Sequence, residues 1–203
     1  MIVVVDYGMG NLKSVLKAVE YLGYEGIISD NALDIQAADK LILPGVGAFP
    51  DAMKNLIKLD LKNLLTQEVM KKGKPVLGIC LGAQLIAKES FEGGRTQGLG
   101  WVEAIVKPFN HNDHSLKSIH TGWNNVKFRK SSSLLTNIKD NTAFYFVHGY
   151  YLDCADDSIV LTTSQYGNQF ASSLQVENIY ATQFHPEKSQ KAGLTLLENF
   201  LEV

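Results

Sequence analysis

Cysteine is scarce in this chain, and so are long apolar runs and any excess of positive charge. Its 203 residues include two cysteines, Cys80 and Cys154, too few for a disulfide framework. Apolar stretches such as Ile2–Val5 fall far short of the roughly 20 residues that span a bilayer. The first six residues also lack the cationic leader of a secretory signal. We therefore expect a cytoplasmic protein without membrane association, in which each cysteine is a thiol.

The charge balance also excludes some partners. The chain carries 19 Lys and Arg against 21 Asp and Glu, a formal net charge of −2. Such a chain has no basic field for holding a phosphate backbone, so we expect no nucleic-acid binding. Hydrophobic residues make up 45% of the chain, enough for a sizeable core. Against a prior of roughly 150 residues per domain, residues 1–203 are expected to form a single domain.

The first half of the sequence alternates short apolar runs with longer segments of helical period. Three runs read as strands buried on both faces, Ile2–Val5, Lys40–Leu43 and Pro75–Ile79. Apolar residues spaced by three and four predict helices over 12–22, 49–70 and 82–91, with Asn11 as the cap of the first. Strands that alternate with helices imply a parallel sheet with helices on both faces.

The second half has more strands and fewer helices. Strand-like runs cover residues 102–106, 124–128, 143–147, 159–164, 171–175 and 179–183, mostly separated only by turns. A last helix carries Leu194, Leu197 and Leu201 on one stripe. We therefore expect an α/β fold with a central mixed, mainly parallel sheet flanked by helices and an additional antiparallel sheet region.

The segment Gly78-Ile79-Cys80-Leu81-Gly82 follows a predicted strand and opens a predicted helix. It has the form of the nucleophile elbow G-x-S-x-G, with cysteine in place of serine. The flanking glycines remove Cβ atoms that would collide in so tight a turn, and the helix start aims amide N–H groups at a developing oxyanion. A buried structural cysteine could look similar but would not need both glycines. The pattern favours Cys80 as a nucleophile.

A thiol nucleophile needs a base, and only His185 of the five histidines has a suitable context. His185 ends a predicted strand, and Pro186 keeps it out of helical conformation. Glu187 is near enough to accept a hydrogen bond from the imidazole and hold its tautomer. Alone, the motif fits a surface histidine beside an acid equally well. Together with the elbow it predicts a triad of Cys80, His185 and Glu187.

Other candidate features are weaker. Pro44-Gly45-Val46-Gly47 also ends a predicted strand, and its glycines would let backbone N–H groups complete an oxyanion hole beside the Leu81 amide. An ordinary strand-to-helix turn is the other interpretation. His111 and His114 have a spacing that metals sometimes use, but they lie in a polar loop without a thiolate, so we expect no metal. Cys154 has acidic neighbours that raise its pKa, and we expect no chemical role for it.

These motifs together resemble the class I, or triad, glutamine amidotransferases, in which a cysteine attacks the amide of glutamine and releases ammonia. The resemblance rests on Pro44–Gly47, Gly78–Gln84 and His185–Glu187. Further segments resemble the glutaminase subunits of imidazole glycerol phosphate synthase: Asp6–Leu12, Ser14-Val15, Gly122–Asn124, Tyr145–His148 and Phe184–Ser189. The resemblance extends over essentially the whole chain and implies a flavodoxin-like fold of the class I amidotransferase type.

The resemblance also implies a role for each matching residue. Cys80 would be the nucleophile, His185 the general base and acid, and Glu187 its orienter. The implied oxyanion hole is Gly45, Val46, Gly47 and Leu81, with a peptide flip in that strand as a possible switch. The implied site for L-glutamine is Gly47, Gln84, Gly149 and Tyr150, and the implied partner interface is Asn11, Trp123, Tyr145 and Lys188. No cofactor is implied.

The implied partner is a cyclase (synthase) subunit with a (β/α)8 barrel, which would form a heterodimer with the chain and use its ammonia in histidine biosynthesis. Three positions depart from the family, with Ala83 and Thr121 where methionine is usual and Gly149 where serine or threonine is common. They leave other interpretations open. The chain could be a related glutaminase subunit that supplies ammonia for amidation of surface sugars, a stand-alone cysteine γ-glutamyl hydrolase, or a catalytically dead regulatory subunit.

Overall fold

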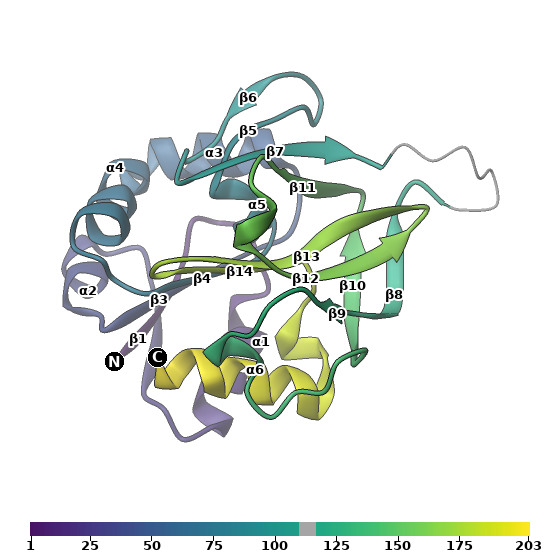
Figure 1. Ribbon diagram of the computed structural model, residues 1–203. Coiled ribbons are helices and arrows are strands. Elements are labelled where there is room, and N and C mark those ends of the chain that lie inside the picture. The colour runs from purple at the N-terminus through teal and green to yellow at the C-terminus, as the bar shows by residue number, and fades with distance from the viewer. Residues whose placement is uncertain (110–116) are drawn as a thin grey trace.

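A computed structural model describes residues 1–109 and 117–203 of the chain. Figure 1 shows a large twisted sheet through the middle, helices on both of its sides and two smaller sheets beside it. In the described part of the chain, no helix is both long and apolar enough to cross a membrane.

Among the described residues, eight strands form the large sheet, in the order β2-β1-β3-β4-β14-β13-β12-β9. The first five pair in parallel and the last three antiparallel. This agrees with a mixed, mainly parallel sheet. The strands are β1 (Ile2–Val5), β2 (Gly26–Ser29), β3 (Lys40–Gly45), β4 (Val76–Cys80), β9 (Lys127–Phe128), β12 (Val160–Tyr166), β13 (Asn168–Val176) and β14 (Ile179–Thr182).

The two smaller sheets contain the other six strands of the described residues. One has the order β11-β7-β5-β6, built from β5 (Ala87–Ser90), β6 (Thr96–Gln97), β7 (Val102–Pro108) and β11 (Tyr150–Cys154). The other pairs β8 (His120–Asn125) with β10 (Ala143–His148). All of these pairings are antiparallel except that of β5 with β7, which confirms the expected antiparallel region.

Alternation along β1 explains why its apolar run is continuous. Ile2 and Val4 belong to the core on one face of the sheet, which also contains buried residues of α1 (Leu12–Tyr21) and α6 (Gln190–Glu202). Val3 and Val5 belong to the core on the other face, with residues of α2 (Ala32–Ala37), α3 (Phe49–Lys58) and α4 (Leu61–Thr66). Both faces are therefore buried, as the sequence predicts.

Two predicted helices are wrong in extent. The segment 49–70 is not one helix, because Asp60 has a left-handed backbone (φ 56°) that separates α3 from α4, and a π-helical turn follows over Gln67–Lys71. The predicted helix 82–91 ends at once, since α5 spans only Leu81–Leu85. Residues Ala87–Ser90 instead form β5, where pairing with β7 and β6 supplies hydrogen bonds that override local helical preference.

The start of α1 also differs from expectation. Asn11 stands at the cap position, but its side chain makes no capping hydrogen bond. Its backbone carbonyl accepts from the N–H groups of Ser14 and Val15 instead. The preceding Gly10 has a φ of 131°, a conformation that favours glycine, and this conformation sets how the backbone enters the helix.

Candidate functional site

Cys80 is the last residue of β4 and the first residue before α5, and its backbone is strained. Its φ of 55° and ψ of −107° lie outside the conformations that residues with a Cβ prefer. A Cβ at Gly82 would lie 1.7 Å from the Leu43 carbonyl oxygen, and one at Gly78 would lie 2.8 Å from Cα of Ala83. Glycine at 82 therefore allows the turn to pack against β3, and glycine at 78 allows α5 to fold back onto β4, as expected for a nucleophile elbow.

His185 follows the end of β14, the strand that pairs with β4 on the side opposite β3. Its Nδ1 lies 2.8 Å from Oε1 of Glu187, and both side chains are 2% exposed. Since a carboxylate only accepts hydrogen bonds, Nδ1 carries a proton, and in the neutral form of the ring Nε2 is the nitrogen with a lone pair. The backbone of His185 is fixed as well, because its N–H donates to Tyr145 O and its carbonyl accepts from Ser189 Oγ.

The electrostatic state of His185 depends on both neighbours. Burial by itself lowers the pKa of the imidazole, but hydrogen bonding and charge interaction with Cys80 and Glu187 outweigh it and raise the pKa to about 9. The Cys80 thiol thus lies close to the ring. Its Sγ donates to Val147 O at 3.7 Å and lies 3.9 Å from Nε2 of Gln183. The nucleophile and base are adjacent, and Sγ of Cys80 also has Val147 O as a hydrogen-bond acceptor.

The predicted oxyanion strand lies directly beside the nucleophile. Gly45 pairs with Cys80 in the register between β3 and β4. A Cβ at Gly45 would lie 2.0 Å from the hydroxyl of Tyr7 and 3.0 Å from Cβ of Leu81, so no larger residue fits. The fully buried Tyr7 hydroxyl donates to Pro44 O at 2.7 Å, and burial followed by the charge of Cys80 raises the pKa of Tyr7. The hydrogen bond from Tyr7 therefore fixes the orientation of the Pro44 carbonyl.

A cavity of about 470 Å³ opens over Cys80. It lies where the ends of β3 and β4 meet the segment that joins β10 to β11. All four residues predicted to bind glutamine line it, as do Val46 and Leu81 of the predicted oxyanion hole. The complete lining is Val46, Gly47, Cys80, Leu81, Gln84, Glu92, Ile119, Val147, His148, Gly149, Tyr150 and Lys188.

Glu92 is a cavity residue that the sequence analysis did not identify. Its Oε2 accepts a hydrogen bond from the backbone N–H of Phe49 at 2.9 Å, which holds the carboxylate at the cavity wall. Glu92 follows β5 in a turn with Gly93 and Gly94, and nothing in that local pattern marks it for binding. Glu92 reaches the site because the preceding residues form strand β5 of a smaller sheet in place of the predicted helix.

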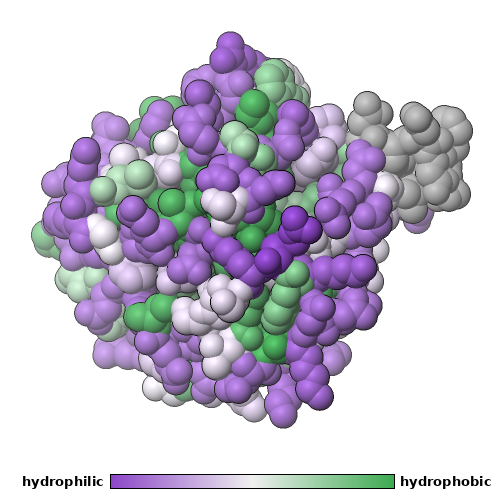
Figure 2. Space-filling model, viewed as in Figure 1, coloured by the Kyte–Doolittle hydropathy of each residue, from purple (hydrophilic) through white to green (hydrophobic). Residues whose placement is uncertain are grey.

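Of the four residues predicted for a partner interface, Lys188 lines this cavity, and the other three lie on or beside elements near the turn Pro186–Lys188. Trp123 on β8 and Tyr145 on β10 are paired in register with ring centroids 6.0 Å apart, and Trp123 is 50% exposed. Tyr145 donates its N–H to Ser189 Oγ, directly after the exposed Lys188. The helix that begins after Asn11 packs against the turn Pro186–Lys188. Figure 2 shows one whole face of the molecule, where hydrophilic side chains surround smaller apolar patches.

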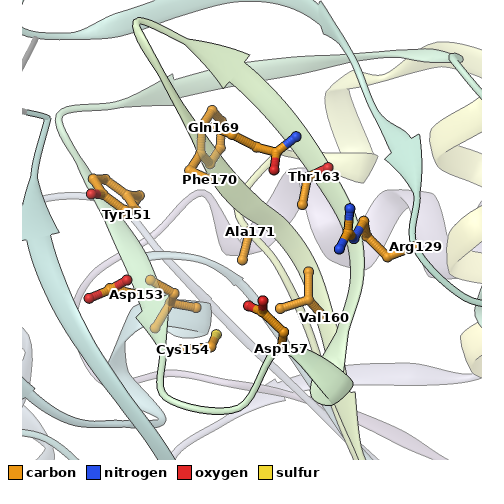
Figure 3. Close-up of a pocket in the computed structure, with 11 residues that line it drawn as sticks. Arg129, Tyr151, Asp153, Cys154, Asp157, Val160, Thr163, Gln169, Phe170 and Ala171 are labelled. Carbon is orange, nitrogen blue, oxygen red and sulfur yellow. The ribbon is translucent and has the colours of Figure 1, made fainter.

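Cys154 lies on β11, away from the cavity over Cys80. Burial and then Asp153, Asp157 and Asp156 raise its pKa to about 12, so it is protonated at neutral pH. Figure 3 shows it in a smaller cavity of about 120 Å³, where Tyr151 and Asp153 lie on one side and Arg129 on the other. The raised pKa agrees with the expectation from the sequence, although burial is a larger cause than the acidic neighbours.

The structure identifies no metal centre in the part of the chain that it describes. Within residues 1–109 and 117–203, no group of three or more His, Cys, Asp or Glu side chains is arranged to hold a metal ion. His111 and His114, whose spacing drew attention in the sequence, lie outside the described residues.

Comparison with known proteins places the chain in a family. The class-I glutamine amidotransferase model matches residues 3–203. The imidazole glycerol phosphate synthase subunit HisH 1 of Campylobacter jejuni (strain RM1221) is 48% identical, with 100% of each chain covered. Subunit HisH of Aquifex aeolicus (strain VF5) is 49% identical, with 98% and 94% covered.

Solved structures show the same fold. A glutamine amidotransferase structure covers 100% of this chain and 98% of its own, with a TM-score of 0.74 at 20% identity. At that identity the likeness supports the fold alone, and it agrees with the predicted amidotransferase-type architecture. The full-length sequence matches are what identify the relatives. The chain belongs to the class-I glutamine amidotransferases and, within them, to the family of imidazole glycerol phosphate synthase HisH subunits.

Proposed function

We propose that Cys80, His185 and Glu187 hydrolyse L-glutamine to glutamate and ammonia. The Cys80 sulfur attacks the side-chain carbonyl carbon after its proton passes to His185 Nε2, and a tetrahedral oxyanion forms. His185 returns the proton to the leaving nitrogen, the C–N bond breaks, and ammonia departs from a γ-glutamyl thioester. Water then attacks the thioester with His185 as base, which releases glutamate and restores the thiol. Glu187 holds the tautomer that makes both transfers possible.

The observation that carries this proposal is the strained Cys80 turn, which lines a cavity and lies beside the buried His185–Glu187 pair. The Leu81 amide and the strand Gly45–Gly47 would stabilise the oxyanion. Removing one such preorganised donor typically costs on the order of 100-fold to 1000-fold in rate. In the isolated chain the thiol donates to Val147 O. We therefore expect the chain to be nearly idle until docking of a partner realigns the thiol and the strand.

The cavity suits one amino acid. Its volume of about 470 Å³ lies within the range of small-ligand pockets, roughly 300–1,000 Å³. We propose that Gly47, Gln84, Gly149 and Tyr150 position the glutamine. The carboxylate of Glu92 adds a recognition element, because it would pair with the α-ammonium group and so distinguish an amino acid from a simple amide.

We further propose that the ammonia passes to a cyclase subunit with a (β/α)8 barrel, docked on Asn11, Trp123, Tyr145 and Lys188 as a heterodimer. The relatives at 48% and 49% identity bear the name of a synthase subunit, which favours a role in histidine biosynthesis over sugar amidation or independent γ-glutamyl hydrolysis. Ammonia would leave near exposed aromatic residues that a docked protein shields from water. A thiol nucleophile also fits the expected cytoplasmic location.

Labelling with a glutamine-like electrophile tests the chemistry. We expect mass spectrometry to find the label on Cys80, and we expect excess L-glutamine to slow the labelling. Cys154 is an internal control because its raised pKa keeps it protonated. Glutaminase turnover measured with and without the purified cyclase then tests activation. Label on Cys154 would refute the assignment of the nucleophile, and rapid turnover by the isolated chain would refute activation by the partner.

A further inference from the structure

His120 and His148 form a buried pair that the proposed chemistry does not use. They lie opposite each other in the register between β8 and β10, which run side by side in Figure 1. His120 Nδ1 lies 3.1 Å from His148 Nε2, and the residues are 4% and 6% exposed. The aromatic rings around the pair are those of Phe109, Phe146, Tyr166 and Phe170.

The groups at the two ends of the pair fix both tautomers. Tyr150 O lies 2.7 Å from His148 Nδ1 and can only accept, so Nδ1 of His148 carries the proton and Nε2 does not. His120 must then donate from its own Nδ1, which leaves its Nε2 as the acceptor. Asn124 Nδ2 lies 3.1 Å from that nitrogen, and its donation to Gln165 O at 2.9 Å confirms which Asn124 atom is the amide nitrogen. Every hydrogen bond therefore points from Asn124 toward Tyr150.

The pair remains neutral in the physiological range. Burial lowers the pKa of His120 to about 4. Burial, together with the nearby His120 and His185, lowers the pKa of His148 to about 3, although its hydrogen bond to Tyr150 opposes this. Protonation of either ring would place an N–H group on a nitrogen that now accepts a hydrogen bond, so that two donors would face each other. The direction of the hydrogen bonds from Asn124 to Tyr150 is therefore the same throughout the physiological pH range.

This chain of hydrogen bonds continues into the cavity. Tyr150 O accepts a second hydrogen bond from Gln84 Nε2 at 2.9 Å, and the same nitrogen lies 3.1 Å from Gln183 Oε1. Both protons of the Gln84 amide are thus used. Its Oε1 is the polar atom that remains for a ligand in the cavity that Gln84 lines. The orientation of Gln84 depends on a carbonyl that His148 holds in place.

We propose that His120 and His148 are positioning residues for the glutamine site, which hold the Tyr150 carbonyl so that Gln84 presents its amide oxygen to the substrate. This inference rests on the proposed function, because it assumes that the cavity binds glutamine. The series of hydrogen bonds begins at Asn124 on β8, the strand that also carries the exposed Trp123, and it ends at Gln84 in the proposed substrate site. His148 lines the cavity, but its two ring nitrogens are engaged by His120 and Tyr150, so neither histidine moves a proton in the reaction.

Binding of L-glutamine to the full chain with the substitution Cys80→Ala, measured by calorimetry, tests the role without turnover. Adding His148→Phe keeps an aromatic ring but removes the donor to Tyr150, and we expect the Kd to rise about tenfold, which corresponds to one hydrogen bond. Adding His148→Asn instead places an amide N–H near the former Nδ1. We expect that variant to bind within about threefold of the reference, because the donor is restored.

Nitrogen NMR of the unsubstituted chain provides a readout that does not depend on a substitution. We expect both rings to be neutral Nδ1–H tautomers between pH 5 and 8. An Nε2–H tautomer at His148, an unchanged Kd in His148→Phe, or no recovery in His148→Asn would each overturn the inference while the proposed function stands. If the Cys80→Ala chain itself binds no glutamine, the proposed function is refuted and the inference with it.

Discussion

Replacing Glu187 by glutamine removes one charge from the buried pair while keeping the shape of the side chain. In the folded chain the pKa of His185 is raised from 6.5 to about 9. A basic group whose pKa is raised by folding stabilises the fold fully below pH 6.5, and this contribution is lost as the pH rises to about 9. The full rise corresponds to about 3 kcal/mol in the free energy of unfolding.

Glu187 accounts for only part of that rise, since Cys80 also favours the charged imidazole. We therefore expect Glu187→Gln to lower the free energy of unfolding by about 1–2 kcal/mol at pH 6 and by much less above pH 9. We also expect the pKa of His185 to fall, because burial is no longer fully offset. Urea unfolding at several pH values and NMR titration of His185 measure the two effects.

The exposed Glu198 on α6 offers a matched control. Glu198→Gln removes the same charge from the surface, and its effect should stay within about 0.5 kcal/mol at every pH. A loss for Glu187→Gln that is equal at pH 6 and pH 9.5 would refute the electrostatic argument. So would an unchanged pKa of His185, because the carboxylate would then have no charge interaction with the ring.

Further predictions concern the nucleophile's surroundings and the docking face. Gly45→Ala should destabilise the chain by about 1–3 kcal/mol in thermal unfolding, because its Cβ would lie 2.0 Å from the Tyr7 hydroxyl. Tyr7→Phe removes the donor to Pro44 O and should lower the free energy of unfolding by about 1–3 kcal/mol. The same substitution should cost less in the Gly45→Ala background, because it also removes the hydroxyl that the new Cβ meets. Additive losses in the double variant would contradict the proposed clash. Trp123→Ala should weaken binding of the cyclase at least about tenfold in calorimetry, while its Tm stays close to that of the parent because the side chain is half exposed; unchanged affinity would exclude it from the interface.

Local pattern was enough to predict much of the fold. The continuous apolar run Ile2–Val5 predicted a strand buried on both faces, and β1 confirms it. The glycines around Cys80 predicted a turn without room for Cβ atoms, and the distances to neighbouring backbone confirm that too. The chemical roles of Cys80, His185 and Glu187 remain predictions, although the structure brings the three side chains together.

Features that depend on distant pairing could not be predicted. Residues Ala87–Ser90 have no strong strand preference, and they form β5 only because β7 offers a partner edge. Glu92 reaches the cavity as a result of that pairing. The contact between His120 and His148 joins residues 28 positions apart, so neither histidine has a recognisable local context. In each case the deciding interaction is absent from the surrounding sequence.

The strand order β3-β4-β14 limits how far changes in loop length elsewhere in the fold can affect the site. Gly45, Cys80 and His185 come from the carboxyl ends of three adjoining parallel strands. Neighbouring strands are held about 4.8 Å apart by their backbone hydrogen bonds, whatever their side chains. The spacing of the strands therefore sets the distances between the backbones of the reacting residues. Loops at the amino ends of these strands are free to vary in length without changing those distances.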